Sequence, residues 1–443
     1  MSECLVSRFC TFVLLTLPFF TGSFSRLDAQ ASGSERLFAG YFEEWGIPYT
    51  NFNISNLEKA GIAGRLNYLI YAFGNVTSGA DPKCTIADPV AAYQNESVPS
   101  VNGKPYATSL RGNFGGIQQL KELHPRLKVL ISLGGQLGSS AGWETASRTA
   151  EGRAVLVSSC VDLFVKGNIA PGIQAPGLFD GFNIDWEFPG GADKQNFTAL
   201  LAEFRAQLRA LSKSTGKRYI LSFDSPASPQ KYANIDLKAA AEQVDFLTID
   251  GYDYAGDSDR QTNEQSPLYE GVGNPLRDQA SSIDETVTAY LNAGVPPEKY
   301  TMGFPLYAVG WTGVANANHG LYEKVGAPSP VLLADGSGPC PNPDKAAPAP
   351  GCDTLLTPGY LTYATIEKLI GRFGYEEWYD AVRVEATLYN PATGTFYSYD
   401  DPKSVAAKTA YIRRRHLGGA YVWALNQDDA EGSLTKTIAD GLK

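Results

Sequence analysis

Apolar runs with the length of strands alternate with longer amphipathic stretches along most of the chain. The runs are rich in β-branched and aromatic residues and cover 37–43, 68–73, 128–133, 181–187, 219–224, 246–250, 300–305 and 419–424. Between them, apolar residues recur at helical spacing over stretches such as 114–123, 153–164, 196–211, 281–292 and 404–415. Strands that alternate with helices are typical of a parallel sheet. The eight runs therefore predict an α/β fold, a closed (β/α)8 TIM barrel, with its functional residues at the carboxyl ends of the strands.

Two intervals between the predicted strands are longer than a barrel connection needs. Residues 75–112 follow the second strand, and residues 312–396 follow the seventh. The second interval is rich in Pro and Gly over 327–358 and then has two alternating aromatic and polar runs, which a hairpin loop at 390–394 separates. Long insertions often form lids or cleft walls. We predict a small α+β insertion domain at 312–396 within a barrel formed by 36–311 and 397–443.

The first 31 residues have the features of a signal peptide. Arg8 precedes an apolar run over 9–20, and Ala29-Gln30-Ala31 matches a small-residue cleavage site. The alternative is a membrane anchor, for which the run is short. We expect a secreted, extracellular protein that is not bound to a membrane after cleavage.

Four cysteines follow the predicted cleavage site, and an even number in an exported chain favours disulfide bonds. Cys340 and Cys352 flank a loop rich in Pro, Gly and Ala, so we expect them to pair, which leaves Cys84 for Cys160. No cysteine pair has the spacing of a zinc site, and the chain has only three histidines. We expect neither a metal nor another cofactor.

Composition narrows the classes of partner. Of the 443 residues, 43% are hydrophobic, which is enough for a large core, and the net charge is −10. An acidic balance disfavours nucleic acid and anionic membranes, whose recognition needs basic patches, whereas a neutral polysaccharide is compatible with it. We expect a monomer that binds no nucleic acid.

The predicted strand 181–187 carries three polar side chains on one face. Because side chains alternate along a strand, Asn183, Asp185 and Glu187 would point into the barrel while the apolar residues between them face the helices. Carboxyls inside a barrel are costly unless they are paired or functional, and a buried structural cluster is the alternative. Two carboxyls this close do not ionise together easily, so one pKa rises. Glu187 is then the candidate general acid, with Asp185 as its partner.

The position of the two acids also limits the reaction. Asp185 and Glu187 stand on the same strand, so they are poorly placed to flank a glycosidic bond from opposite faces. A 2-acetamido group on the sugar can supply the missing nucleophile by attacking its own anomeric carbon. Asp185 would orient the acetamido nitrogen while Glu187 protonates the leaving oxygen. The arrangement favours an acetamido sugar as substrate.

Short motifs occur at the ends of most predicted strands. In chain order they are Gly40-Tyr41-Phe42, Tyr71-Ala72-Phe73, Ser132-Leu133-Gly134-Gly135, the acids Asp180, Asp185 and Glu187, Tyr252-Asp253-Tyr254, Tyr307, and Trp423 after Gly418-Gly419. Together they resemble the family 18 glycoside hydrolases, the substrate-assisted retaining chitinases, whose signature is D-x-x-D-x-D-x-E. The resemblance covers nearly the whole chain after residue 31, and the insertion at 312–396 resembles the chitinase insertion domain.

The resemblance implies hydrolysis of β-1,4-linked N-acetylglucosamine polymers, chitin or its oligosaccharides, with Glu187 as general acid/base. It implies that Tyr252 donates a hydrogen bond to the acetamido oxygen and that the sugar stacks on Trp423. The remaining residues would either bind substrate, namely Asp253, Tyr307, Tyr41 and Phe73, or support the acids, namely Asp180, Asn183 and Ser132. For the aromatic residues core packing is the alternative.

Four positions depart from the family's pattern, one of them Val309, where an arginine often follows the strand-7 tyrosine. The family's second aspartate is Asn183 here, which removes a negative charge beside Asp185, so we expect a lower pKa of Asp185 and a shifted or narrower pH optimum. The methionine of the Tyr252 motif is Asp250 here, which adds an acid near the site. A tryptophan often follows the third-strand motif, where this chain has Gln136, and Trp143 is close enough in sequence to replace it.

Three alternative functions stay open. A chitin-binding lectin on the same barrel is disfavoured because such relatives typically lack the acid that is Glu187 here. An endo-β-N-acetylglucosaminidase acting on N-glycans shares the acidic signature, but the insertion favours chitin. A metal hydrolase would use the carboxylates to hold Mg²⁺ or Ca²⁺, yet nothing in the sequence supplies phosphate binding.

Overall fold

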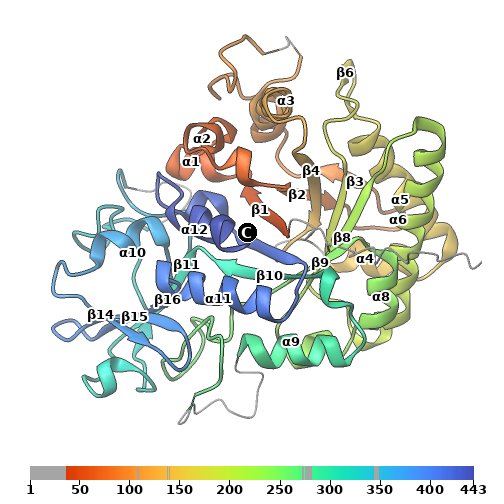
Figure 1. Ribbon diagram of the computed structural model, residues 1–443. Helices are drawn as coiled ribbons and strands as arrows, with labels where there is room; N and C mark the ends of the chain where they lie inside the picture. The colour runs from red at the N-terminus through yellow and green to blue at the C-terminus, as the bar shows by residue number, and fades with distance from the viewer. Residues whose placement is uncertain are drawn as a thin grey trace, which may run out of the picture. The chain divides into compact units, whose positions relative to one another are not determined.

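Eight parallel strands close into a barrel, as the sequence predicts (Figure 1). They pair in the order β1–β2–β4–β7–β8–β9–β10–β17, and β17 pairs with β1 to complete the ring. Their bounds are Leu37–Glu43 (β1), Tyr68–Val76 (β2), Lys128–Gly134 (β4), Gly181–Asp185 (β7), Ile220–Ser225 (β8), Phe246–Ile249 (β9), Tyr300–Pro305 (β10) and Gly419–Trp423 (β17). A further strand, β3 (Cys84–Ile86), pairs antiparallel with the end of β2.

The computed structural model describes residues 36–443 except 107–108, 137, 139, 272–273, 275–281 and 344–348. Arg36–Lys443 forms one compact unit. The predicted signal peptide at 1–31 lies outside the described residues. Within the described ranges no helix has both the length and the apolar character that crossing a membrane requires.

Helices cover the outside of the barrel (Figure 1). Those that follow the barrel strands are α3 (Gly112–Leu123), α5 (Ala150–Cys160), α6 (Lys194–Thr215), α8 (Leu237–Gln243), α9 (Ile283–Asn292) and α11 (Pro402–Arg414), and the chain ends with α12 (Ser433–Gly441). Local signals fix their ends: Asp401 and Ser404 cap α11 reciprocally with Pro402 as its first residue, and α6 stops at Gly216, whose φ is 70°. The predicted helix 153–164 runs from α5 into a π-helical turn at Val161–Val165.

Aromatic residues on the outward side of β7 and directly after it pack against the helical layer. Phe182 packs on Phe204 of α6 with ring centroids 5.2 Å apart, and Trp186 packs on Phe197 of α6 at 6.0 Å. Ile184, which lies between them in sequence, is also buried in this core. The alternation predicted for this strand is therefore confirmed, and the polar residues are left for the interior.

A second, antiparallel sheet follows β10. Its strands are β11 (Tyr307–Thr312), β12 (Ala327–Pro328), β13 (Tyr360–Thr362), β14 (Glu376–Asp380), β15 (Glu385–Asn390) and β16 (Thr395–Tyr399), with the short helix α10 (Tyr363–Leu369) after β13. The predicted hairpin is present, since β15 and β16 pair across the turn before Gly394, whose φ is 62°. The sheet extends beyond 312–396 at both ends because the chain enters β11 directly from barrel strand β10. The division into two domains stays a prediction.

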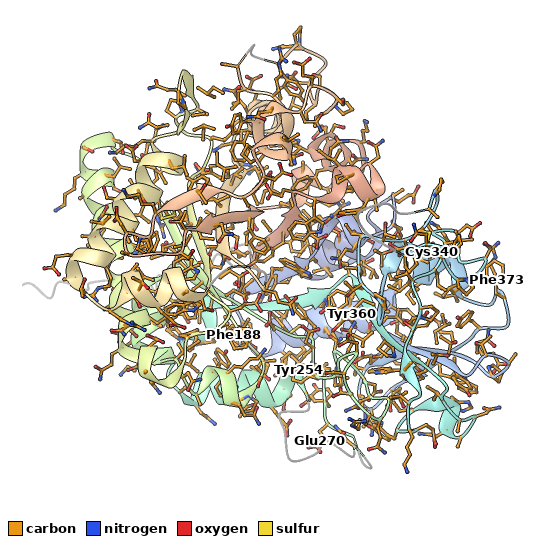
Figure 2. The ribbon with its side chains drawn as sticks, turned by 180° about the vertical axis from the view of Figure 1, so that it is seen from behind. Phe188, Tyr254, Glu270, Cys340, Tyr360 and Phe373 are labelled. Carbon is orange, nitrogen blue, oxygen red and sulfur yellow. A yellow bond between two sulfur atoms is a disulfide. The ribbon has the colours of Figure 1, made fainter. Side chains whose placement is uncertain are left out.

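Both predicted disulfide bonds are present. Cys84 of β3 is bonded to Cys160 at the end of α5, which ties the loop after β2 to the helical layer. Cys340 is bonded to Cys352 and closes the Pro-rich loop, and Cys340 lies among the elements of the second sheet in Figure 2.

Candidate active site

Asn183 stands inside the barrel and joins four other strands. Its Oδ1 accepts hydrogen bonds from the hydroxyls of Tyr41 at 3.0 Å and Ser132 at 2.8 Å. Its Nδ2 donates to Ser222 at 3.0 Å and to Thr248 at 3.3 Å. All five side chains are at most 1% exposed. The structure thus brings Tyr41, Ser132 and Asn183 together, and Asn183 uses both ends of its amide in the layer beneath the acids.

Asp185 lies at the end of β7 and is 4% exposed. Its Oδ1 has no hydrogen-bond partner among the described residues. Burial raises the pKa of Asp185 well above its ordinary value, and the charges of Glu187 and Asp250 raise it further. The backbone also packs closely here, since a Cβ on Gly134 would lie 2.0 Å from the carbonyl oxygen of Asp185. This contact explains the first glycine of the Ser132–Gly135 motif.

Glu187 lies two residues beyond the end of β7 and is half-buried. Burial raises its pKa to about 7, the positive charge of Lys231 opposes this rise, and the charge of Asp253 adds to it. The Nζ of Lys231 lies 4.1 Å from the ring centroid of Phe188, next to Glu187 in the chain, and Figure 2 shows Phe188 beside the barrel strands. A carboxyl with this pKa and partial exposure to solvent has the properties of a general acid near neutral pH.

Two more carboxyls face the same interior. Asp224, on β8, accepts a hydrogen bond of 3.0 Å from the Thr248 hydroxyl, and burial together with the charges of Asp250 and Asp185 raises its pKa well above the ordinary value. Burial is also the main cause that raises the pKa of Asp250 to about 8. The sequence pattern pointed to Asp250 as an additional acid, whereas Asp224 was not predicted. Its signal was the alternation that puts Ser222 and Asp224 on one face of their strand.

Tyr252 follows β9 and reaches toward β17. Its hydroxyl lies 3.0 Å from the hydroxyl of Tyr421, which donates a hydrogen bond of 2.8 Å to Oδ1 of Asp250. Tyr421 was also missed by the sequence analysis. The next residue, Asp253, is exposed with φ of 59° and accepts a hydrogen bond of 2.5 Å from the Tyr307 hydroxyl. The structure thus brings the predicted pair Asp253 and Tyr307 into direct contact.

Aromatic rings form a row beside the acids. The Trp423 ring is half-exposed, and its centroid lies 5.1 Å from Tyr41 and 5.8 Å from Phe73. Phe73 in turn stacks on Trp45 at 5.9 Å, with the ring planes 26° apart. Flat apolar faces of this kind suit the apolar faces of sugar rings. Trp311, on β11, is fully buried and presents no such exposed face.

Asp180 lies at the opposite end of β7. Its Oδ2 is 2.7 Å from Nζ of Lys121 and accepts a hydrogen bond of 2.9 Å from the backbone N–H of Val129. Lys128 adds a longer contact of 3.6 Å. Asp180 therefore lies at the amino end of β7, away from Asp185 and Glu187 at the carboxyl end. In a TIM barrel the amino ends of the strands serve stability.

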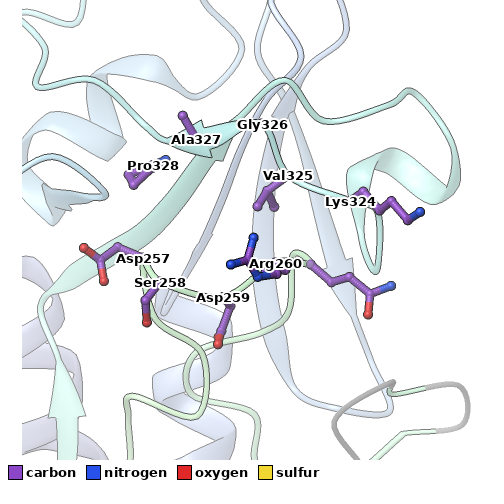
Figure 3. A pocket seen from close by; sticks show the side chains of 10 residues that line it. Asp257, Ser258, Asp259, Arg260, Lys324, Val325, Gly326, Ala327 and Pro328 are labelled. Carbon is purple, nitrogen blue, oxygen red and sulfur yellow. The ribbon is translucent and has the colours of Figure 1, made fainter.

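Neither a metal site nor the pocket found in the described part of the chain offers an alternative to this cluster of acids. Its His, Cys, Asp and Glu side chains include no group of three or more placed to hold a metal ion. A pocket of about 690 Å³ lies between the loop 257–261 and residues 324–328 (Figure 3). Its lining includes none of the acids named above.

Comparison with known proteins agrees with this geometry. Residues 37–428 match the family described as Glycosyl hydrolases family 18. The chain belongs to this family. Among curated proteins it is similar to Chitinase A1 of Niallia circulans (29% identical, covering 99% of this chain and 62% of the relative) and to Chitinase A of Pseudoalteromonas piscicida (28% identical, covering 92% and 52%). The chain thus spans only about half to three fifths of the length of these family 18 relatives.

Among solved structures, the chain is similar to the catalytic domain of a psychrophilic chitinase B from Arthrobacter TAD20. The two are 30% identical with a TM-score of 0.79, and the match covers 92% of this chain and 95% of that one. The family 18 fold therefore extends over the whole described barrel and the second sheet.

One expectation drawn from the family 18 pattern was wrong. Trp143, on α4 (Ser140–Ser147), is 1% exposed and stacks on Trp186 with ring centroids 6.1 Å apart. Trp186 points away from the interior, so Trp143 belongs to the core outside the barrel. It does not replace the aromatic residue missing at Gln136.

Proposed function

We propose that this chain is a secreted chitinase that hydrolyses β-1,4-linked N-acetylglucosamine polymers with retention of configuration. The observation that carries the proposal is the position of buried Asp185 and half-buried Glu187 at one strand end, where each acid has a raised pKa and that of Glu187 lies at about 7. Glu187 is therefore mostly protonated below neutral pH, yet can release its proton and take it back. Relatives named as chitinases support chitin as the substrate.

The first half of the reaction breaks the glycosidic bond. Glu187 gives its proton to the leaving oxygen while the acetamido oxygen of the same sugar attacks the anomeric carbon. The product is a cyclic oxazolinium ion, with the acetamido group on the face opposite to the leaving group. Asp185 and Glu187 come from one strand end, so Asp185 is poorly placed to attack from that opposite face.

The second half restores the enzyme. The Glu187 carboxylate takes a proton from water, whose oxygen attacks the anomeric carbon and opens the five-membered oxazolinium ring. The anomeric carbon is attacked twice, once on each face, so its configuration is retained. Glu187 is then protonated for the next cycle.

The neighbouring residues act on the acetamido group and on the sugar ring. The unpartnered Oδ1 of Asp185 is an acceptor for the acetamido N–H, which becomes more acidic as the ring closes. Tyr252 donates to the acetamido oxygen and holds it for attack. The sugar stacks on Trp423, while Asp253 and Tyr307 bind polar groups of the substrate.

The decisive experiment is product analysis on N-acetylated chitin oligomers of defined length, comparing the parent with Glu187→Gln. We expect the variant to lose roughly 10²- to 10⁴-fold in kcat, and the parent to release the β-anomer first. Glu431→Gln, at an exposed position, is the matched control and should retain full activity. Unchanged hydrolysis by Glu187→Gln would refute the mechanism, and oligosaccharide release from a glycoprotein but not from chitin would assign the enzyme to N-glycans.

Two further measurements separate the alternatives. Activity that persists in EDTA excludes the metal hydrolase, whereas binding of chitin oligomers without any hydrolysis by the parent identifies a lectin. Expression of the full chain in a secretory host, followed by N-terminal sequencing of the protein in the medium, tests cleavage after residue 31.

A further inference from the structure

A chain of hydrogen bonds connects Asp250 to Tyr252 through Tyr421. The Tyr421 hydroxyl lies 2.8 Å from Oδ1 of Asp250 and 3.0 Å from the Tyr252 hydroxyl. Tyr421 is 0% exposed, so solvent does not compete for its hydroxyl. A tyrosine hydroxyl has one proton to donate but can also accept. The group at the end of the chain, Asp250, therefore sets the direction of both hydrogen bonds.

The two protonation states of Asp250 give opposite directions. An ionised Asp250 can only accept a hydrogen bond, so Tyr421 donates to it, and Tyr421 can then only accept a hydrogen bond from Tyr252. A protonated Asp250 can donate a hydrogen bond to Tyr421, whose hydroxyl then donates one to Tyr252. In that second arrangement the proton of Tyr252 is free to point elsewhere.

We propose that Asp250 is a positioning residue that controls, through Tyr421, whether the Tyr252 hydroxyl is free to donate to the acetamido oxygen of the substrate. The inference rests on the proposed function, in which that oxygen attacks the anomeric carbon. Hydroxyl groups rotate and Asp250 exchanges one proton with solvent, and no covalent bond of the substrate changes in this step. Asp250 itself needs no contact with the sugar.

The groups around Asp250 determine the pH at which it loses its proton. Burial and the charge of Asp253 raise its pKa to about 8. The carboxyls that face it are Asp185 and Glu187 from β7 and its end, Asp224 from β8 and Asp253 from the loop after β9. The other tyrosines that face it are Tyr41, Tyr254, Tyr290, Tyr300 and Tyr307. The hydrogen-bond chain is therefore set for substrate binding below about pH 8 and reversed above it.

The test measures binding in a background where Glu187 cannot titrate. Tetra-N-acetylchitotetraose is titrated into Glu187→Gln, and Kd is measured from pH 6 to 9.5. We expect Kd to rise roughly 3- to 10-fold across pH 8, the effect of one neutral hydrogen bond. Adding Tyr421→Phe removes the connection through Tyr421 and leaves only the direct interaction of Asp250 with Tyr252, whereas adding Asp250→Asn removes the ionisation. The step in Kd should shrink in the Tyr421→Phe double variant, and in the Asp250→Asn double variant Kd should change less than twofold over the same range.

Tyr290→Phe in the same Glu187→Gln background is the control. Tyr290 faces Asp250, but its hydroxyl bonds to Ser225 and to the carbonyl oxygen of Pro226, so the pH step should persist. Circular dichroism at each pH verifies that the variants are folded. A pH-independent Kd in Glu187→Gln, or an unaltered step in both the Tyr421→Phe and Asp250→Asn double variants, overturns the proposal. Neither result bears on the role of Glu187 as general acid, which the hydrolysis experiment tests separately.

Discussion

The hydroxyl of Ser132 donates a hydrogen bond of 2.8 Å to the amide oxygen of Asn183, inside the barrel and directly below the acids. The opposite end of this amide donates to Ser222 and Thr248. An aspartate at 183 could keep the first contact but could not donate, so these two hydroxyls would have to turn toward it. The asparagine therefore completes the network without adding a sixth carboxyl to Asp185, Glu187, Asp224, Asp250 and Asp253.

We predict that Asn183→Asp raises the pKa of Asp185 and of Glu187. A new carboxylate in this buried layer repels their ionised forms, so both keep their protons to higher pH. The alkaline limb of the kcat profile should move up by about one pH unit, and thermal stability should fall because another charge is buried. A pH–rate profile identical to that of the parent would contradict this. Asn183→Ala, which adds no charge, is the control for the loss of the amide.

The raised pKa values of the acids also predict how stability depends on pH. Glu187 and Asp250 have pKa values of about 7 and about 8 in the folded protein, well above the ordinary carboxyl values that apply when it is unfolded. Between about pH 4 and 8 the unfolded chain therefore binds fewer protons than the folded one, and stability falls as pH rises. We expect the Tm to decrease from pH 5 to 8, and to decrease less steeply in Asp250→Asn. An equally steep decrease in that variant would show that Asp250 is ionised in the folded protein.

The two disulfide bonds should differ in what they contribute. Cys84–Cys160 closes a loop with a sequence separation of 76, and Cys340–Cys352 one of 12. In the chain-entropy account these correspond to about 4 and about 3 kcal/mol of unfolding free energy. We predict that Cys84→Ala with Cys160→Ala lowers the Tm more than Cys340→Ala with Cys352→Ala, as calorimetry can measure. The reverse order would mean that the Pro-rich loop is more important for stability than its length indicates.

Much of the barrel could be predicted because strand pattern is a local property. The bounds of β1 and β10 coincide with the predicted runs. That Asp185 and Glu187 share one face follows from the alternation of side chains along the predicted strand 181–187. The disulfide partners followed from the small number of cysteines. These inferences needed no knowledge of which strands are neighbours.

The residues that were missed depend on how the barrel closes. Tyr421 and Asp250 are 171 positions apart and meet only because β17 and the end of β9, on either side of β10, face one interior. Asp224 was passed over because its hydrogen-bond partner, Thr248, lies on another strand. Trp143 was misplaced because closeness in sequence does not say which side of the barrel a helix occupies. Interior contacts between distant strands are thus what the sequence pattern leaves out.

The row of rings beside the acids gives a final prediction about substrate binding. The Trp423 ring packs near the rings of both Tyr41 and Phe73, whereas Trp45 packs only near Phe73 among these three rings. We propose that Trp423 lies under the sugar whose bond is broken, so its stacking should strengthen as that sugar distorts. Trp423→Ala should lower kcat/KM for N-acetylated chitotetraose by roughly 10- to 100-fold, the cost of losing the apolar surface that one large side chain buries against the sugar. Trp45→Ala, farther along the row, should raise KM with little effect on kcat. Equal losses of kcat in the two variants would show that Trp423 has no special position relative to the reacting sugar.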